Sequence, residues 1–329
     1  VIDLVAEIAG NDMRFYIKKV EAARNFCNKV YNASRFVLMN LPDAGVGPID
    51  LGLLDGADKW ILHRLNTVVR EVTFNLDHFD LNLAAQKIYD FIWTEFCDWD
   101  IELAKPRLGG EDEAQKANVR AILVRVLGDS MKLLHPFMPF ITEELYLALP
   151  ASGETIMRSA WPLYDESLSF PAEAETMERI MDVIRSIRNL RAEMNVPPAK
   201  RAAMTIVTEA GRIPSFEAAS VYVMRLAGAE SVKVQSDKAG VPEGAVSAVC
   251  ESAEVYIPLK ELIDVEKERE RTAKEMERVH GEISRAEGKL SNESFVQKAP
   301  EKVIAAEKEK LETARGMLLK LEQRLAELN

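Results

Sequence analysis

The sequence has few cysteines and no long apolar run. Its 329 residues include three cysteines, Cys27, Cys97 and Cys250, far apart and in no paired spacing. This excludes a sequence-readable zinc knuckle and argues against a disulfide framework, so we interpret the three as small buried hydrophobic residues. No stretch of roughly 18 uncharged apolar residues occurs, and the first residues lack the basic and apolar segments of a signal peptide. We therefore expect a soluble, cytoplasmic protein without a membrane-spanning segment.

An excess of basic residues is also missing. The formal net charge is -11 at pH 7, from 42 Lys and Arg against 53 Asp and Glu. Phosphate binding depends largely on Lys and Arg side chains that release counterions. Any nucleic-acid contact must therefore come from local basic patches, because the average charge gives it no support.

Helical periodicity dominates the first half of the chain, with breaks at the Gly/Pro/Asp-rich stretch 41–56 and near 105–113. The pattern predicts an up-and-down bundle with helices at about 12–40, 57–77, 81–104, 112–134 and 137–149, followed by a helix at 172–194. Residues 202–208, 231–234 and 252–258 are typical of short strands, and 215–226 of a helix. We expect these last segments to form a small α/β module.

The last seventy residues follow a heptad pattern. Apolar side chains recur on three- and four-residue steps from Leu262 to Leu290 and from Ile304 to Leu328, with Arg269 and Thr272 at weak positions and Glu307 out of pattern. Two helices of about four heptads, joined by a link that holds Pro300, can fold back as an antiparallel coiled-coil hairpin. The whole sequence thus predicts a mainly α fold.

One helix carries a distinctive polar face. In steps of ~100° per residue, one arc of the helix from Met13 to Met39 collects Asn25, Asn28, Lys29, Asn32, Arg35 and Phe36. The other side collects Ala23, Phe26, Cys27, Val30, Tyr31, Val37 and Leu38. Amides can bind base edges, cations can bind phosphates, and an aromatic ring can stack on an unpaired base.

A solvated helix face is the alternative interpretation of this arc. Three asparagines argue against this alternative. Asparagine is a poor helix former, and a helix face without a binding role would be more stable with Glu, Gln or Lys. For Phe36, packing into the loop that starts at Leu41 remains an equal alternative to stacking on RNA.

The segment 24–36, RNFCNKVYNASRF, resembles the opening helix of the anticodon-binding domain in class I aminoacyl-tRNA synthetases for valine, isoleucine and leucine. It is most similar to the valine enzymes. Further similarities follow in the family's order: DKWIL at 58–62, FCDW at 96–99 with Glu102 and Lys105, HPFMPFITEEL at 135–145 and AWP at 160–162. The resemblance covers about residues 12–329, and several dense motifs in order are far more specific than any one of them.

The C-terminal hairpin favours the valine enzymes. The segment 290–303, LSNESFVQKAPEKV, resembles the turn of their terminal coiled coil, whereas isoleucine enzymes usually end in a cysteine-bearing zinc module that this chain lacks. The resemblance implies that the bundle holds the anticodon loop of tRNA and that the hairpin leans on its outer corner. It implies four parts: 1–11 from the end of a catalytic region, a helical anticodon-binding domain at 12–165, a connecting helix and α/β module at 166–258, and a tRNA-binding arm at 259–329.

Specific residues follow from the matched positions. The resemblance implies anticodon contacts from Lys18, Arg24, Asn25, Lys29, Asn32, Arg35, Phe36 and Ile101, and contacts to the tRNA corner from Lys289, Lys298 and Lys302. We interpret Trp93, Trp99 and Trp161 as core anchors instead of stacking platforms. The four histidines lie too far apart in sequence to suggest a shared site, and we interpret each as structural.

The two ATP signatures of class I synthetases, His-Ile-Gly-His and Lys-Met-Ser-Lys-Ser, do not occur in the sequence, and no glycine-rich phosphate loop replaces them. We therefore expect no catalytic residue, metal or cofactor in this chain, and no aminoacylation by the chain alone. The resemblance implies an enzyme that uses ATP to attach valine to tRNA(Val), with upstream catalytic and editing domains as partners and a monomeric state. Two alternatives stay open: a non-enzymatic coiled-coil scaffold, and the equivalent region of another aliphatic aminoacyl-tRNA synthetase.

Overall fold

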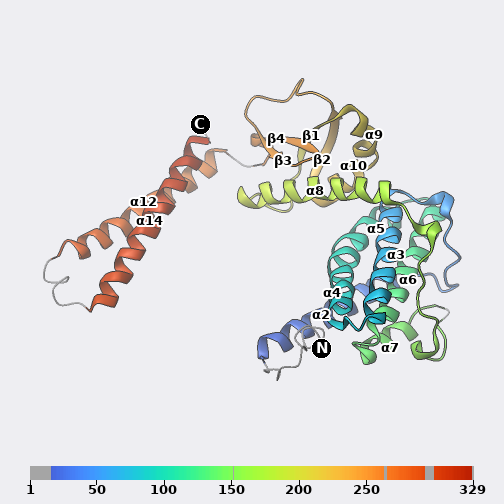
Figure 1. The fold of residues 1–329 in the computed structure, drawn as a ribbon. Coiled ribbons are helices and arrows are strands. Elements are labelled where there is room, and N and C mark those ends of the chain that lie inside the picture. The colour runs from blue at the N-terminus through green and yellow to red at the C-terminus, as the bar shows by residue number, and fades with distance from the viewer. Residues whose placement is uncertain (1–15, 151, 263–264, 293–299, 328–329) are drawn as a thin grey trace. The chain divides into compact units, whose positions relative to one another are not determined.

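The computed structural model describes residues 16–150, 152–262, 265–292 and 300–327. Most of these residues are helical, and one four-stranded sheet lies among them (Figure 1). The predicted mainly α fold is therefore confirmed. The chain forms two compact units: the first runs to Ser186 and includes Glu209–Ala227 and Cys250–Ser252, and the second holds the remaining residues. The four parts and borders implied by the resemblance stay predictions.

The helical bundle belongs to the first unit. Its helices are α2 (Ile17–Met39), α3 (Gly56–Asp77), α4 (Leu81–Asp90), α5 (Ile101–Leu108), α6 (Glu113–Leu134) and α7 (Pro139–Leu147), with the short turns η1 (Leu51–Leu53), η3 (Ile156–Arg158) and η4 (Glu166–Leu168) between or after them. A π-helical segment, η2 (Phe91–Asp100), joins α4 directly to α5. The predicted helix at 81–104 is thus one continuous helical run whose middle is π-helical, and the periodicity did not predict this π-helical segment.

Local sequence features mark where α3, α6 and α7 begin. The Asp55 carboxylate accepts a hydrogen bond from the Asp58 backbone N–H at 2.9 Å, and the Asp58 carboxylate accepts one from the Asp55 backbone N–H at 3.2 Å, which is a capping box at the start of α3. Asp112 caps α6 by accepting hydrogen bonds from the backbone N–H groups of Ala114 and Gln115. Pro139 begins α7, where its missing N–H costs no hydrogen bond.

Large apolar side chains from every bundle helix meet in one core. Trp60, Phe26, Phe91, Phe96, Leu62 and Ile122 are among those that are fully buried. Trp99 is buried too, in agreement with its predicted anchoring role. Trp161 is half-buried and donates its indole N–H to Thr73 Oγ1 at 2.9 Å, so it anchors the segment after α7 to α3.

The sheet belongs to the second unit. Its strands β1 (Ala202–Thr208), β2 (Ala229–Gln235), β3 (Ala245–Val249) and β4 (Ala253–Pro258) lie in the order β2-β1-β4-β3, with β1 and β2 parallel and the other pairs antiparallel. Alternate residues of β1 are buried, as expected for a strand with one covered face. Strand β3 was not predicted; it is a short edge strand that pairs with β4, the next strand along the chain, as an antiparallel hairpin.

Three helices complete the region between the bundle and the arm. They are α8 (Pro171–Glu193), α9 (Ile213–Ala218) and α10 (Ser220–Ala227), with η5 (Ala210–Arg212) before α9. The predicted helix at 215–226 is thus two short helices that meet at Ala219. Both belong to the first unit, whereas the strands on either side belong to the second.

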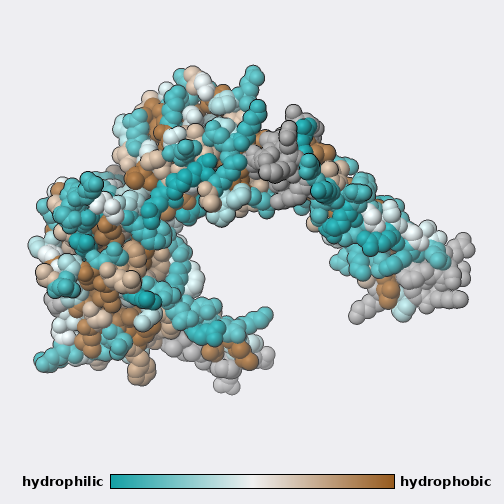
Figure 2. Space-filling model, turned by 180° about the vertical axis from the view of Figure 1, so that it is seen from behind, coloured by the Kyte–Doolittle hydropathy of each residue, from teal (hydrophilic) through white to brown (hydrophobic). Residues whose placement is uncertain are grey.

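The C-terminal residues form the predicted antiparallel helical hairpin (Figure 1). Its helices, α12 (Val265–Leu290) and α14 (Glu301–Glu327), have 26 and 27 residues, so each extends about 40 Å at ~1.5 Å per residue. Val279, Ile283 and Ala314 are buried in the seam, with Leu311, Leu318 and Leu321 packed against them. The face of the hairpin seen in Figure 2 is largely hydrophilic outside this seam. No helix of the described ranges is both long and apolar enough to cross a membrane.

Candidate nucleic-acid interface

Helix α2 presents a row of polar side chains to solvent. Arg24, Asn25, Asn28, Asn32 and Arg35 are all exposed, and Lys18 is exposed in the first turns. Within the described ranges these six side chains have no hydrogen-bond or ion-pair partner in the protein. Their amides and charges are therefore available to an external ligand, and the predicted polar face exists. We call this set, with Lys29 and Phe36, the α2 stripe.

The opposite side of α2 anchors the helix in the bundle. Phe26, Val30, Ala33, Ser34 and Val37 are buried, and the Ser34 hydroxyl donates to the Val30 carbonyl at 2.9 Å. Tyr31 was predicted on this side and is instead 54% exposed. At ~100° per residue, Tyr31 lies about 140° from Phe26 and only about 20° from Arg24. The tyrosine ring therefore borders the α2 stripe and is a further candidate for stacking that the sequence interpretation missed.

The α2 helix is a local basic region of an acidic chain. Between Ile17 and Met39 it carries Lys18, Lys19, Arg24, Lys29 and Arg35 against one acidic residue, Glu21, a formal net charge of +4. The chain as a whole has a net charge of -11. Because counterion release depends on local charge, this helix supplies the basic patch that phosphate binding requires, although the chain as a whole is acidic.

Lys29 lies on the stripe but is already engaged within the protein. Its ammonium lies 2.6 Å from Asp98 Oδ1 and 3.8 Å from the centre of the Trp93 ring. Both partners belong to η2, which packs against α2. The prediction placed Trp93 as a core anchor; its ring is half-buried and forms a platform for Lys29.

Phe36 is half-buried at the other end of the stripe. The Lys105 ammonium lies 5.5 Å from the centre of the Phe36 ring, and Lys105 also forms an ion pair with Glu102. The Asn40 side chain donates to the Phe36 carbonyl at 2.8 Å. The ring is thus partly covered by α5, and Lys105 adds a cation to this end of the stripe.

Ile101 does not lie on the exposed surface, which corrects the prediction that it reaches toward RNA. Its side chain is 6% exposed, and its α5 neighbours Leu103 and Ala104 are also buried. The resemblance placed Ile101 near the anticodon loop by its position in the matched motif, whereas in this chain that position packs into the interior of the bundle. Glu102 and Lys105 are the half-exposed residues at this point.

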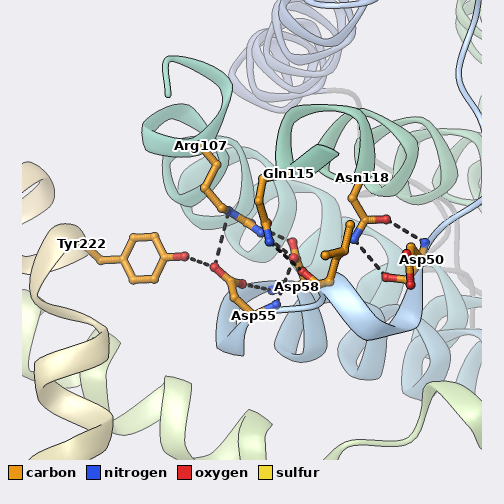
Figure 3. Close-up of polar contacts among 8 residues, drawn as sticks. Asp50, Asp55, Asp58, Arg107, Gln115, Asn118 and Tyr222 are labelled. Carbon is orange, nitrogen blue, oxygen red and sulfur yellow. Dashed lines mark hydrogen bonds and ion pairs between the residues drawn. The ribbon is translucent and has the colours of Figure 1, made fainter. Parts of the chain in front are cut away.

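A buried polar network connects α3, α5, α6 and α10. The Arg107 guanidinium donates to both oxygens of Asp58, at 2.6 Å for the second bond, and also approaches Asp55, which accepts from the Tyr222 hydroxyl (Figure 3). Asn118 of α6 exchanges two hydrogen bonds with the Asp50 backbone and so holds the loop before α3 (Figure 3). These bonds connect elements that are far apart in sequence.

Burial decides the electrostatics of this network. Burial raises the pKa of Asp58, which the hydrogen bonds and charge of Arg107 oppose. Burial also raises the pKa of Asp100 well above its usual range, with the charge of Asp58 adding to it. For Arg107, burial alone would lower the pKa, but the bonds and charges of Asp58 and Asp55 outweigh it and raise the pKa. Asp58, Asp100 and Tyr222 are each at most 5% exposed, so these three side chains of the network lie inside the bundle and stabilise it.

The arm positions predicted to meet tRNA are only partly described. Lys289 is exposed near the end of α12, and its ammonium lies 3.1 Å from Glu307 Oε1 of α14. Lys298 lies outside the described residues, as does the side chain of Lys302. Lys310 also contacts Glu307, at 3.3 Å, so two cations share one carboxylate at this point of the hairpin. Across the described ranges, no three His, Cys, Asp or Glu side chains are grouped as a metal site would need.

Comparison with known proteins places these features in a family. Residues 58–206 match the anticodon-binding domain of tRNA ligases, and residues 264–329 match the tRNA binding arm of valyl-tRNA synthetases. The chain is 50% identical over 320 residues to a valine–tRNA ligase of Clostridium acetobutylicum and 49% identical to one of Clostridium tetani. It is 46% identical over 321 residues to one of Bacillus cereus.

The alignments include 97% of this chain, and the chain spans 36% of the length of each of these relatives. The two matched families follow one another along the chain as the helical bundle and the helical arm do in the structure. The chain belongs to the bacterial valine–tRNA ligase family and corresponds to its C-terminal part, which carries the anticodon-binding domain and the tRNA-binding arm.

Proposed function

We propose that this chain is the tRNA-recognition region of a valine–tRNA ligase. The bundle holds the anticodon loop on the α2 stripe, and the arm holds the outer corner of the same tRNA. The observation that carries the proposal is the set of exposed amides and cations on α2 that have no partner among the described residues, on a chain whose net charge is otherwise acidic.

The chemistry of the stripe suits single-stranded RNA. Asn25, Asn28 and Asn32 supply donors and acceptors for base edges, and Arg24 and Arg35 supply charges for phosphates. Phe36 and the exposed Tyr31 border the same surface and supply rings on which an unpaired base can stack. A folded anticodon loop offers all three features at once.

The proposal extends to the partners of the chain. Its relatives are named as valine–tRNA ligases, so the specific partner is tRNA(Val), and the catalytic and editing regions of the same enzyme act on the acceptor end with ATP and valine. Within that enzyme the chain binds tRNA and positions it, as a monomer in the cytoplasm.

Arg35→Ala tests the proposal directly. We expect a loss of roughly 1–3 kcal/mol in binding to a tRNA(Val) transcript, the usual size of a charge-assisted contact, measured by fluorescence anisotropy at one fixed salt concentration. Arg225→Ala is the matched control, because Arg225 is also exposed, lies on α10 away from the α2 stripe and changes the net charge equally. An identical dissociation constant for Arg35→Ala and the wild type would remove Arg35 from the site.

Specificity needs a separate measurement. Binding of the same protein to purified tRNA species for valine, isoleucine and leucine is expected to favour tRNA(Val). Equal affinity for all three would contradict the assignment to valine while leaving the tRNA-binding role in place.

A further inference from the structure

Lys29 differs from the other cations of the α2 stripe because two side chains of η2 hold its ammonium. Asp98 Oδ1 lies 2.6 Å from Lys29 Nζ, and the Trp93 ring centre lies 3.8 Å from the same atom. The Lys29 side chain is 23% exposed and the Asp98 side chain 49% exposed. The ammonium is therefore near the surface but is neutralised by a carboxylate that remains in contact with water.

The Trp93 ring is itself held firmly by other rings. Its centre lies 5.7 Å from that of Tyr89 and 6.3 Å from that of Phe26, and the Phe26 and Tyr89 rings stack at 4.7 Å. Phe26 comes from the buried side of α2, and Tyr89 from α4. This stack fixes the plane on which Lys29 rests, whereas Asp98 has no such support among the contacts of the described residues.

Lys29 also occupies the middle of the stripe. Asn25 precedes it by four residues and Asn32 follows it by three, so both are its neighbours on the helix surface. An RNA strand that contacts these two asparagines would pass over Lys29 and bring a phosphate toward both its ammonium and the Asp98 carboxylate. Asp98 would repel that phosphate, and its exposed carboxylate would become hydrated when Lys29 leaves it.

On this geometry we propose that Asp98 is a positioning residue that holds Lys29 in the unbound protein and releases its ammonium to an RNA phosphate on binding. Trp93 keeps the ammonium in place during this exchange. The inference rests on the proposed function of the α2 stripe. It adds that Asp98 competes with an RNA phosphate for the Lys29 ammonium.

Asp98→Asn tests the exchange in the full chain with an RNA hairpin that carries the valine anticodon. The amide can still accept a hydrogen bond from Lys29 but no longer neutralises it. We expect about twofold to fivefold tighter binding, the equilibrium equivalent of removing an exposed ion pair. The plot of log binding constant against log salt should also steepen by about 0.7, because the wild type takes up a counterion at Asp98 when the phosphate displaces it.

Two further variants separate this effect from general charge and from folding. Asp77→Asn makes the same change in net charge at an exposed site at the end of α3 and is expected to leave the affinity and the salt slope near those of the wild type. In a Lys29→Met background, Asp98→Asn should give no gain, because the freed ammonium is absent. A gain that persists without Lys29, or an Asp98→Asn affinity and slope equal to or below those of the wild type, would overturn the inference.

Trp93 has its own pair of variants. Trp93→Phe keeps a π face under the ammonium and is expected to bind like the wild type, whereas Trp93→Leu should weaken binding by about twofold to fivefold, the worth of a near-surface cation–π contact. Thermal melting of both variants checks that the bundle remains folded. Equal affinity of a folded Trp93→Leu variant and the wild type would remove Trp93 from the proposal.

The outcome for Arg35 separates the two hypotheses. If Arg35→Ala weakens binding and Asp98→Asn has no effect, the α2 stripe binds RNA and the exchange at Lys29 is wrong. If neither variant changes binding, the proposed RNA-binding surface itself is wrong.

Discussion

Arg107 holds the buried charges in the interior of the bundle together. It compensates the buried Asp58 through two hydrogen bonds and lies within 3.4 Å of Asp55. Removing one member of a buried ion pair leaves the other charge unpaired, which typically costs about 3–5 kcal/mol.

We therefore expect Arg107→Ala to reduce the free energy of unfolding of the bundle by about that amount. Urea unfolding followed by tryptophan fluorescence measures it, because all four tryptophans, Trp60, Trp93, Trp99 and Trp161, lie in the bundle unit. Arg225→Ala removes an exposed arginine of the same unit and is expected to change stability by no more than about 0.5 kcal/mol. Equal unfolding curves for both variants would contradict a stabilising role for the Arg107 network.

For single residues of α2, the sequence predicts which side chains are exposed better than it predicts which side chains they contact. A 100° step places Asn25, Asn32 and Arg35 away from Phe26 and Val30, and the structure agrees because a straight helix keeps its period. The engagement of Lys29 by Trp93 and Asp98 depends on two helices about sixty residues apart in sequence, which no local pattern contains. Ile101 was expected at the RNA from the resemblance alone, and its burial depends on packing between helices, which a matched motif does not contain.

The arm shows what a repeat predicts about an element and what it leaves out. The heptads predict two antiparallel helices and their seam, because apolar residues at that spacing must be buried against a partner helix. They leave Glu307 unexplained. The structure places Glu307 at 9% exposure between Lys289 of the facing helix and Lys310 of its own, so the exception to the pattern is an ion pair across the hairpin.

This ion pair makes the stability of the arm depend on pH. Hydrogen bonds from Lys289, together with the smaller effect of Lys310, hold the pKa of Glu307 below its usual value. A carboxylate whose folded pKa is lowered contributes stability that is fully present above the ordinary glutamate pKa of about 4.3 and is lost as the pH falls through the folded value.

Glu307→Gln should remove that dependence. Melting of the helical signal, followed by circular dichroism from about pH 3 to about pH 7, is expected to show an advantage of the wild type near pH 6 that disappears in acid. An advantage that stays constant over the whole range would mean that Glu307 stabilises the hairpin by packing and not by charge.

For the whole molecule, composition alone is misleading. A net charge of -11 argues against RNA binding, yet the charges are distributed so that α2 is basic. The order of motifs along the chain predicts the parts and their sequence, since each motif belongs to a local element. It does not predict that α9 and α10 group with the bundle while β1 and β2, which flank them, group with the arm, because that division depends on packing between distant segments.

The contacts of the short helix before α12 suggest where the arm can be removed. The backbone N–H of Ala203 in β1 donates to the Glu261 carboxylate at 2.6 Å, and Leu262 is fully buried, so α11 (Leu259–Leu262) stabilises the sheet. A deletion that starts at Val265 keeps these contacts and removes only the hairpin. We therefore expect the truncated chain to retain the unfolding transition of the bundle, as seen by tryptophan fluorescence.

RNA binding by the truncated chain should separate the role of the arm from that of the α2 stripe. If the arm holds the outer corner of tRNA, the deletion weakens binding to full-length tRNA(Val) but leaves the affinity for the anticodon hairpin unchanged, because the hairpin RNA lacks that corner. The salt dependence for full-length tRNA should also become shallower, since fewer phosphates are neutralised. Unchanged affinity for full-length tRNA at the same salt concentration would show that the arm does not bind RNA, and the α2 stripe alone would then account for recognition.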